Sequence, residues 1–304
     1  MSLRQNQQGC FAFVLLVGLL APCSASASKI WEEVSGEKAF EHVRHLVDLG
    51  PRPPGSDAIE KARTYIDNQL STFGWQVTRQ TFTDNTPRGR VTFVNLVARF
   101  RGAARETSLP FFLLCSHYDT KSVETFRFVG ANDGGSSTGL LLELARVLAQ
   151  HPNQAAKVEL VFFDGEEAYE NFSETDGLYG SRYFARDLDK TKAARQFHGG
   201  ILFDMVGDAS LTITLAPNSP SQMAQSIFAA AEALKLRNYF TYFDRDITDD
   251  HTPLNAIGIP TIDLIDFDFA WWHTAGDTID KVSAQSLQIV GSVTAYYLSE
   301  SALK

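Results

Sequence analysis

Histidine and carboxylate side chains recur in short polar segments, each of which follows a run of apolar residues. The segments are 116–119 (SHYD), 164–167 (DGEE), Asp204 and 271–273 (WWH). Several carboxylates and imidazoles gathered in one partly apolar site repel or desolvate one another. A divalent cation removes that conflict, and histidine with carboxylate is a ligand combination that suits zinc. These residue types therefore predict a zinc site, provided that the fold brings them together.

Each segment alone also has an ordinary structural explanation. Glu166 and Glu167 could start a helix, where acidic side chains interact favourably with the helix dipole. Asp133, in the glycine-rich segment GANDGG, could form a turn. Asp204 could cap a helix, and His273 could be a hydrogen-bonded core histidine. We favour the metal site because these residues occur together in one chain, most of them directly after an apolar run.

The apolar runs before these segments are the elements that must position them. Residues 109–115 (LPFFLLC) do not alternate between apolar and polar types, which is typical of a strand with both faces buried in a largely parallel sheet. Similar strands are predicted at 158–163, 201–203 and 261–269. Ligands of an open α/β sheet bind in the crevice at the carboxyl ends of its strands, so the polar segments should meet there.

Helices are predicted between these strands from the spacing of apolar residues. Two further strands, joined by a polar turn, are expected before the first buried run, and Ser56 or Asp57 can cap the second helix. Strands that alternate with helices predict a three-layer α/β/α fold around a mixed, mostly parallel sheet. The predicted helices span 39–49, 58–73, 137–150 and 224–236, and the two further strands span 75–82 and 91–100.

The composition fits one large globular domain and excludes several classes of protein. The 304 residues are 44% apolar and 12% aromatic, which is enough for a sizeable core and excludes wholesale disorder. A formal net charge of −9 argues against a nucleic-acid partner. Three cysteines exclude a disulfide scaffold and a cysteine-rich zinc fold, and Cys115, inside an apolar run, is expected to be an inert buried thiol.

Residues 1–27 read as an export signal, followed by a single domain over 28–304. A lone arginine precedes the apolar segment 10–22, and Ala25-Ser26-Ala27 is a small-x-small cleavage site. The apolar segment is shorter than the roughly 20 residues that span a bilayer, so no stable membrane span is expected. Cys23 could carry a lipoprotein anchor, but the proline before it fits that motif poorly. We expect an exported monomer, periplasmic or secreted, without an internal disulfide.

Together, the motifs resemble those of the zinc-dependent α/β aminopeptidases and their close relatives, the animal-type glutaminyl-peptide cyclotransferases (glutaminyl cyclases). The resemblance covers nearly all of the chain after the export signal. It depends on the order and spacing of seven motifs: GPRPPGS at 50–56, SHYDTK at 116–121, GANDGG at 130–135, FFDGEE at 162–167, LFDMVG at 202–207, DDHTP at 249–253 and WHT at 272–274.

Within this group, several features resemble the cyclases more than the peptidases. They are HYDTK at 117–121, the segment 168–182 that ends in LYGSR, the pair Asp249-Asp250, and Trp272, which stands where the cyclases have a tryptophan in their glutamine pocket. Other features differ from the cyclases. Residues 277–281 (DTIDK) look more like the peptidases, and Phe172 stands where the animal cyclases have a second pocket tryptophan. The cysteine pair that forms their disulfide is also absent.

The resemblance implies a metal site and a general base. Asp133, Glu167 and His273 would hold one zinc ion and leave a fourth ligand position open. The substrate would be a peptide with a free N-terminus, preferably glutamine, whose side-chain carbonyl zinc would polarise. Glu166 would take a proton from the α-amine and pass it to the departing ammonia, which leaves pyroglutamate.

The resemblance also implies residues around that centre. Asp249 and Asp204 would form a hydrogen-bonded carboxylate network near Glu166, with coupled titrations. Trp272 would line the substrate pocket, and Phe172 would occupy its other side.

Two alternatives remain open from the sequence. In a two-zinc aminopeptidase, Asp133 would bridge two metals, and His117 and Asp204 would complete the second site, with Asp119 orienting His117. Glu166 would then activate a water that cleaves the first peptide bond. A zinc-stabilised binding domain without activity is the other alternative. The chain retains Glu166 and every ligand, which argues against this second alternative.

Overall fold

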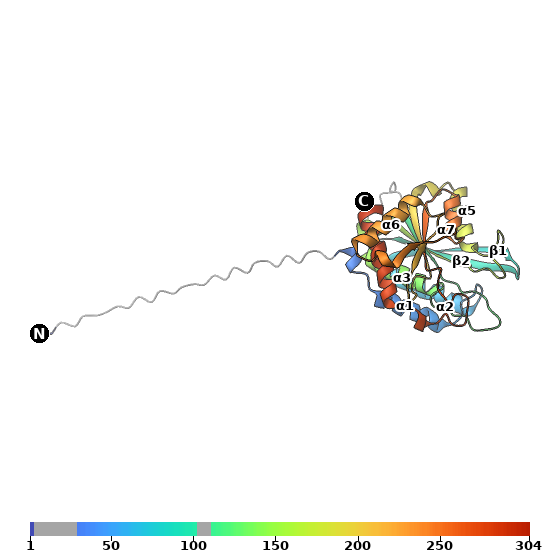
Figure 1. Cartoon of the computed structure of the whole chain (residues 1–304), viewed down its shortest axis with the longest axis horizontal. Helices are drawn as coiled ribbons and strands as arrows, with labels where there is room; N and C mark the ends of the chain where they lie inside the picture. Colours follow the sequence, from blue (N-terminus) through green and yellow to red (C-terminus); the bar gives the residue numbers. More distant parts are fainter. Residues whose placement is uncertain (3–28, 102–110) are drawn as a thin grey trace.

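The computed structural model describes residues 1–2, 29–101 and 111–304. Within them, a mixed eight-stranded sheet runs through the middle of the molecule in the order β1-β2-β4-β3-β5-β8-β6-β7 (Figure 1). The neighbouring strands β4, β3, β5 and β8 are parallel, whereas β2 runs antiparallel to β1 and β4, and β6 to β8. The strands are β1 (Trp75–Thr86), β2 (Gly89–Phe100), β3 (Phe111–His117), β4 (Val158–Phe163), β5 (Phe197–Asp204), β6 (Ile213–Leu215), β7 (Phe240–Tyr242) and β8 (Thr261–Ile265).

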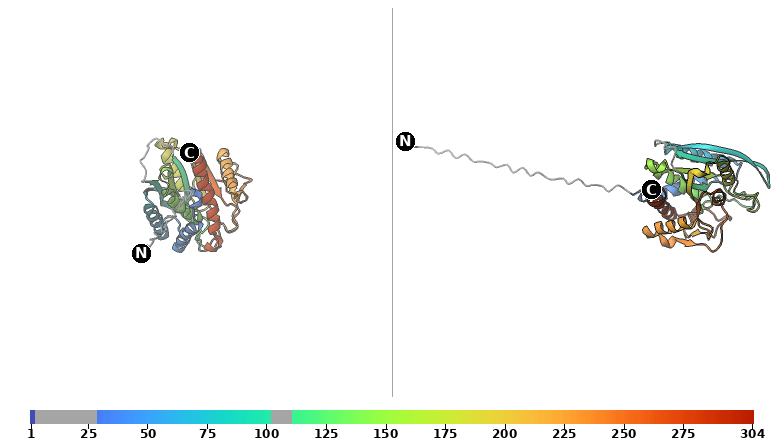
Figure 2. Two further views of the ribbon diagram at one scale, coloured as in Figure 1. Left: turned by 90° about the vertical axis from the view of Figure 1, so that its left-hand side faces the viewer. Right: turned by 90° about the horizontal axis from the view of Figure 1, so that it is seen from above.

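Helices cover both faces of the sheet, as Figure 2 shows, and give the predicted three-layer α/β/α fold. One hydrophobic core joins α1, α2, α3, α6 and α8 to one face, and a second core joins α5 and α7 to the other. The helices are α1 (Gly36–Leu49), α2 (Asp57–Thr72), α3 (Gly135–Ala149), α4 (Pro152–Ala155), α5 (Tyr179–Lys190), α6 (Ser221–Ala233), α7 (His251–Ala256) and α8 (Ala284–Tyr297).

Strand β3 shows why the apolar run does not alternate. Phe112 and Leu114 point into the first core, and Leu113 and Cys115 point into the second. Successive side chains of a strand face opposite sides, so a strand covered on both sides needs apolar residues at every position. Burial of each large side chain contributes roughly 1.5–3 kcal/mol. Cys115 is a free, fully buried cysteine, as predicted, and burial raises the pKa of its thiol.

The starts of α1 and α2 follow the capping rules, although the sequence predicted only the cap of α2 and placed the start of α1 three residues too late, at Ala39. The hydroxyl of Ser56 accepts the backbone N–H of Ile59 at 3.1 Å, so the serine is the N-cap of α2. Helix α1 begins after Ser35, which caps it in the same way, and ends at Gly50 with φ +88°. The chain can therefore turn sharply through the proline-rich segment that follows α1.

The strand predicted over 261–269 is too long, because β8 ends at Ile265. Its parallel neighbour β5 ends opposite that residue, at Asp204, and no further ladder bond is available there. The Asp266 carboxylate instead accepts the backbone N–H of Thr212 at 2.8 Å. The chain then leaves the sheet, so His273 lies on a loop rather than at a strand end.

Several elements were not predicted: α4, α5, α7, α8, β6 and β7. Helix α8 is buried along most of its length and has no polar face to reveal a helical period. Strands β6 and β7 have three residues each, too few for a pattern. Within the described parts of the chain, no helix is both long and apolar enough to cross a membrane. The predicted export signal, apart from its first two residues, and Cys23 lie outside the described residues.

Candidate metal centre and active site

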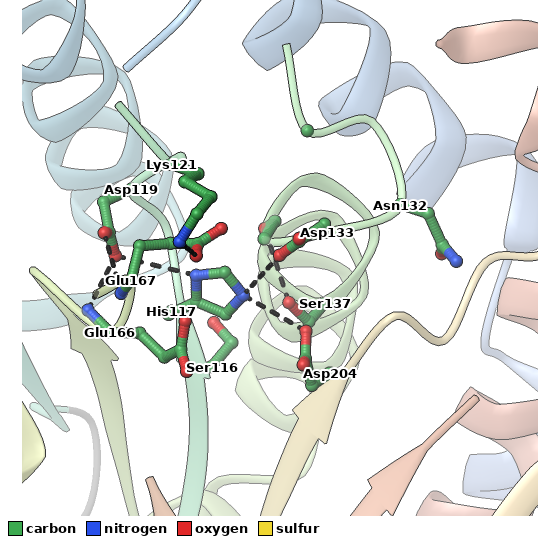
Figure 3. A network of polar contacts seen from close by, with 12 residues as sticks. Ser116, His117, Asp119, Lys121, Asn132, Asp133, Ser137, Glu166, Glu167 and Asp204 are labelled. Atoms are coloured by element: carbon green, nitrogen blue, oxygen red, sulfur yellow. Dashed lines mark hydrogen bonds and ion pairs between the residues drawn. The ribbon is translucent and has the colours of Figure 1, made fainter. Parts of the chain in front are cut away.

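The predicted polar segments meet at the carboxyl ends of the parallel strands. His117 is the last residue of β3 and Asp204 the last of β5, while Glu166 and Glu167 follow closely after β4. Asp133 comes from the glycine-rich loop before α3. Figure 3 shows these side chains gathered around the His117 ring. The fold thus brings together residues from four segments that are distant in sequence.

Asp133, Glu167 and His273 form one group of metal-ligand types, in which one donor atom from each lies within 4.8 Å of the others. His273 Nε2 is 3.1 Å from Glu167 Oε2 and 3.4 Å from Asp133 Oδ2. Both carboxylates are buried, and Glu167 Oε1 has no hydrogen-bond partner among the described residues. A buried carboxylate oxygen without a donor is unfavourable, so a cation in contact with this group fits the site.

His117, Asp133 and Asp204 form a second group that shares Asp133 with the first. His117 Nε2 is 3.1 Å from Asp204 Oδ1 and 3.3 Å from Asp133 Oδ1. On the other side of the ring, His117 Nδ1 is 3.6 Å from Asp119 Oδ1. Asp119 therefore lies where a residue that orients the imidazole would lie.

The electrostatics of both groups favour positive charge. Burial by itself lowers the pKa of His273, but the carboxylates of Asp133 and Glu167 outweigh burial and raise it to about 10. The pKa of His117 is likewise raised against the effect of burial, by Asp119, Asp133 and Asp204. Conversely, the two imidazoles lower the pKa of Asp133 although burial alone would raise it. The same carboxylates that raise the pKa of the two imidazoles would also attract a metal cation.

Glu166 lies next to the ligand groups without being a member of either. Its side chain lines the cavity and is largely buried, with 6% of the residue exposed. Its backbone N–H donates to Asp119 Oδ1 at 3.1 Å, which ties the glutamate to the His117 loop. Burial is the main cause that raises the pKa of Glu166, and the negative charges of Asp249 and Glu167 add to it.

Asp249 lies on the same cavity, in the segment before α7, and is 4% exposed. Burial raises the pKa of its carboxyl, and the charges of Asp204 and Asp250 raise it further. Asp263, on β8, is its neighbour; both carboxylate oxygens are buried without a hydrogen-bond partner among the described residues, and Oδ2 is 3.7 Å from His251 Nδ1. Hence the predicted carboxylates do gather, and Asp263 is a further member of the cluster.

The cavity beside these groups has a volume of about 110 Å³ and an aromatic wall. Trp272 and Phe172 both line it and are 42% and 39% exposed, so their rings are available to a ligand. The Trp272 ring stacks on His273 with 4.3 Å between centroids. The two predicted pocket residues therefore lie together with the carboxylates. The cavity is lined by Asp133, Glu166, Phe172, Asp204, Met205, Ile247, Thr248, Asp249, Ile265, Phe267, Trp272 and His273.

His273 has an unusual backbone, with φ +52°. A left-handed conformation is uncommon for residues other than glycine and costs on the order of 1–3 kcal/mol. Such strain persists where the surroundings fix it, and here it turns the imidazole towards Asp133 and Glu167.

Two supporting residues lie within quoted motifs but had no predicted role. Lys121 Nζ is 3.6 Å from Glu167 Oε2 and donates to the Ala168 carbonyl at 2.8 Å. Asp277 accepts the backbone N–H groups of Asn132 and Asp133 at 2.8 and 3.1 Å, so it fixes the loop that carries a predicted ligand. The only signal in the sequence was their place in the motifs, at 117–121 and 277–281.

Comparisons with known proteins agree with this architecture. Residues 95–298 match the family described as "Peptidase family M28". The "Glutaminyl-peptide cyclotransferase-like protein" of Mus musculus is 32% identical over 282 residues, which cover 82% of this chain and 72% of that protein. The solved structure of a glutaminyl cyclase from an Acidobacteriales bacterium is 33% identical, covers 92% of this chain and 97% of its own, and superimposes with a TM-score of 0.80.

A peptidase structure has the same fold at lower identity. The Zn-dependent exopeptidase from Parabacteroides distasonis is 24% identical, covers 88% of this chain and 98% of its own, and has a TM-score of 0.79. At that identity the likeness concerns the fold alone. The family match spans most of the described sheet and every segment of the site. The chain therefore belongs to peptidase family M28 and is similar over most of its length to glutaminyl cyclases.

Proposed function

We propose that this protein is a zinc-dependent glutaminyl-peptide cyclotransferase, which converts N-terminal glutamine of peptides to pyroglutamate and releases ammonia. The main support is the Glu166 carboxylate, which faces the same cavity as Trp272 and His273 but belongs to neither ligand group. This arrangement occurs in a chain that is 33% identical to a glutaminyl cyclase over almost its whole length.

Asp133, Glu167 and His273 are the proposed zinc ligands. Two carboxylates and one imidazole suit zinc and leave a fourth ligand position open. When bound, zinc supplies Lewis-acid polarisation of the side-chain amide carbonyl of the substrate. The His273 ring must be neutral to act as a ligand, so metal binding releases the proton that Asp133 and Glu167 otherwise favour.

Glu166 moves the proton in the proposed reaction. Its carboxylate takes a proton from the α-amine as the amine nitrogen bonds to the side-chain carbonyl carbon. The C–N bond of the amide then breaks, and the same proton goes to the leaving nitrogen, so that ammonia departs and the lactam remains. A pKa raised by burial suits a group that must both accept and return a proton.

The aromatic wall is the proposed binding surface for the glutaminyl side chain. Trp272 is held by its stacking on His273 and by contact with Phe267, whose ring centroid is 5.5 Å away. Phe172 closes the same cavity from the loop before α5. Apolar walls with a few polar groups are typical of small-ligand pockets.

Product analysis tests this proposal directly. The zinc-loaded protein is incubated separately with Gln-Xaa and Leu-Xaa dipeptides, and the products are read by mass spectrometry. We expect Gln-Xaa to lose one ammonia with its peptide bond intact, and Leu-Xaa to stay unchanged. Release of a free amino acid from either peptide would instead identify a peptidase.

An aminopeptidase is the second candidate, because the His117–Asp133–Asp204 group has the geometry of a second metal site. In that case Asp133 would serve two ions, and Glu166 would activate water rather than an amine. Metal content separates the candidates: we expect one zinc per chain for the cyclase, and two would favour the peptidase. Elemental analysis of protein dialysed against zinc measures this number.

We also propose that residues 1–27 are an export signal and that the mature protein is a periplasmic or secreted monomer. The proposal is supported by the apolar segment and small-x-small site of the sequence. The intact mass of the protein purified from culture medium and periplasm tests the cleavage, and light scattering tests the monomer.

A further inference from the structure

A third acidic group lies outside the cavity and is formed by Asp208, Asp266 and Asp268. One carboxylate oxygen from each lies within 4.8 Å of the others. Asp208 comes four residues after β5, and Asp266 comes directly after β8. Because β5 and β8 are adjacent and parallel, their ends carry these aspartates to one edge of the sheet.

Burial distinguishes this group from an ordinary acidic patch. Asp266 is 0% exposed, and its Oδ1 is buried without a hydrogen-bond partner among the described residues. Its Oδ2 accepts the Thr212 N–H at 2.8 Å, and Asp208 Oδ1 accepts the Ser210 N–H at 3.1 Å. In the described parts of the chain, no lysine, arginine or histidine forms a salt bridge with any of the three carboxylates. A buried carboxylate that has one oxygen without a hydrogen-bond donor and lies beside two further carboxylates is the environment that a bound cation would stabilise.

We propose that Asp208, Asp266 and Asp268 bind a hard divalent cation, calcium, at a site separate from the zinc centre. The donors are all oxygen, which suits calcium, whereas zinc sites usually include nitrogen or sulfur. Calcium accepts irregular sets of carboxylates, carbonyls and waters, while magnesium requires near-octahedral geometry. The exposed side of Asp268 leaves room for waters to complete the ligand sphere.

The position of the group gives the cation a structural role. Phe267 lies between two of the three aspartates, lines the cavity and contacts Trp272. The same loop continues to His273, whose backbone is strained. A cation that links this loop to the segment after β5 would hold the aromatic wall and the loop of His273 in place.

Calcium binding to the zinc-loaded full chain tests the proposal. Isothermal titration with CaCl₂ at pH 7.5 should show one site per chain, with a Kd of about 10⁻⁴–10⁻³ M, as in extracellular calcium modules. Calcium at about ten times its Kd should raise the Tm by about 3 °C, relative to NaCl at equal ionic strength. MgCl₂ should bind at least about tenfold more weakly, since the site has no octahedral frame.

Matched variants locate the site. Asp268→Asn removes one charge at an exposed position and should weaken calcium binding at least tenfold, with zinc content unchanged. Asp246→Asn makes the same change at an exposed residue outside the group and should bind calcium like the wild type. Equal binding by Asp268→Asn and wild type, or no calcium binding at all, overturns the proposal. The absence of calcium binding would be expected if Asp266 and Asp268 shared a proton instead of a cation.

Discussion

Glu166 is the residue on which the proposed chemistry depends most. Replacement by glutamine preserves the size of the side chain and removes its ability to take a proton. We expect Glu166→Gln to keep its zinc and to lower kcat by about 10²–10⁴-fold, the usual contribution of a positioned acid–base group. Steady-state rates with Gln-Xaa substrates and zinc content by elemental analysis measure the two effects.

The matched control for this variant is Glu170→Gln, an exposed glutamate a few residues further along the same loop. It should leave both quantities unchanged. If Glu166→Gln turned over substrate at the wild-type rate, Glu166 would not be the base, whichever reaction the protein catalyses.

His273 provides a separate test of the metal centre. Without its imidazole, only Asp133 and Glu167 remain in the three-ligand group, so we expect His273→Ala to lose zinc on dialysis. The left-handed backbone at this position complicates alanine, which adopts φ +52° with strain. Asparagine tolerates that conformation, and His273→Asn should therefore lose zinc with a smaller fall in Tm.

Full zinc occupancy in both His273 variants would remove this residue from the proposed ligand set. The exposed His198 is the control, because it lies near the amino end of β5, away from the carboxyl end that carries Asp204, and His198→Ala should keep the metal.

The candidate ligands could be predicted from the sequence because each belongs to a short motif and most follow an apolar strand. The supporting residues could not be predicted in the same way. Asp277 hydrogen-bonds Asn132 and Asp133 across 145 and 144 positions of sequence, and Asp263 looks like any polar residue in a strand. Their roles follow from distances that only the folded chain defines.

At the scale of elements, sequence patterns predicted those segments whose environment is uniform along their length. Strands β3 and β4 are buried on both faces and lack alternation, and helices α1 and α2 carry an apolar stripe and a serine cap. Helix α8 has no such stripe because it is buried on most sides. The end of β8 depends on where its neighbour β5 stops, which a single strand does not reveal.

Arg52 connects several of these elements from the middle of the molecule. It is fully buried, and its guanidinium donates to the backbone carbonyls of Leu46, Tyr118, Val129 and others. The same side chain therefore holds the end of α1, the loop after β3 and the loop that carries Asp133. Burial lowers its pKa to about 10, although Asp277, Asp119 and Asp133 act in the opposite direction, so the group stays charged at neutral pH.

We expect Arg52→Met to lower the free energy of unfolding by roughly 3 kcal/mol or more, because several buried carbonyls lose their donor at once. Urea unfolding monitored by tryptophan fluorescence measures this change. The exposed Arg44→Met, on the helix α1 that precedes Arg52, removes an equal charge and should change stability by less than about 0.5 kcal/mol. Equal stability of the two variants would show that Arg52 does not join these elements.

At the scale of the whole molecule, the free energy of unfolding depends on pH through titratable groups whose charged form is disfavoured in the folded state. The buried carboxylates of the site change their pKa when a metal binds, so they report on the metal as well as on folding. His42, on α1, lies away from the predicted metal ligands. Its Nδ1 is 2.6 Å from the Tyr65 hydroxyl, and burial, with His45 and Arg146, lowers its pKa to about 4.

The unfolded chain takes up a proton at His42 near pH 6.5, whereas the folded protein does so only near pH 4. Between these pH values, protonation of His42 favours the unfolded state. The contribution of neutral, buried His42 to the free energy of unfolding is therefore complete above pH 6.5 and is lost as the pH falls towards 4. We expect the wild type to lose about 2 kcal/mol more than His42→Gln between pH 7.5 and pH 4.5. Urea titrations of zinc-loaded protein at both pH values measure the difference, with the exposed His198→Gln as control. Parallel pH profiles for the wild type and His42→Gln would mean that the buried imidazole is protonated at its ordinary pH, and the packing around α1 would then not exclude its charge.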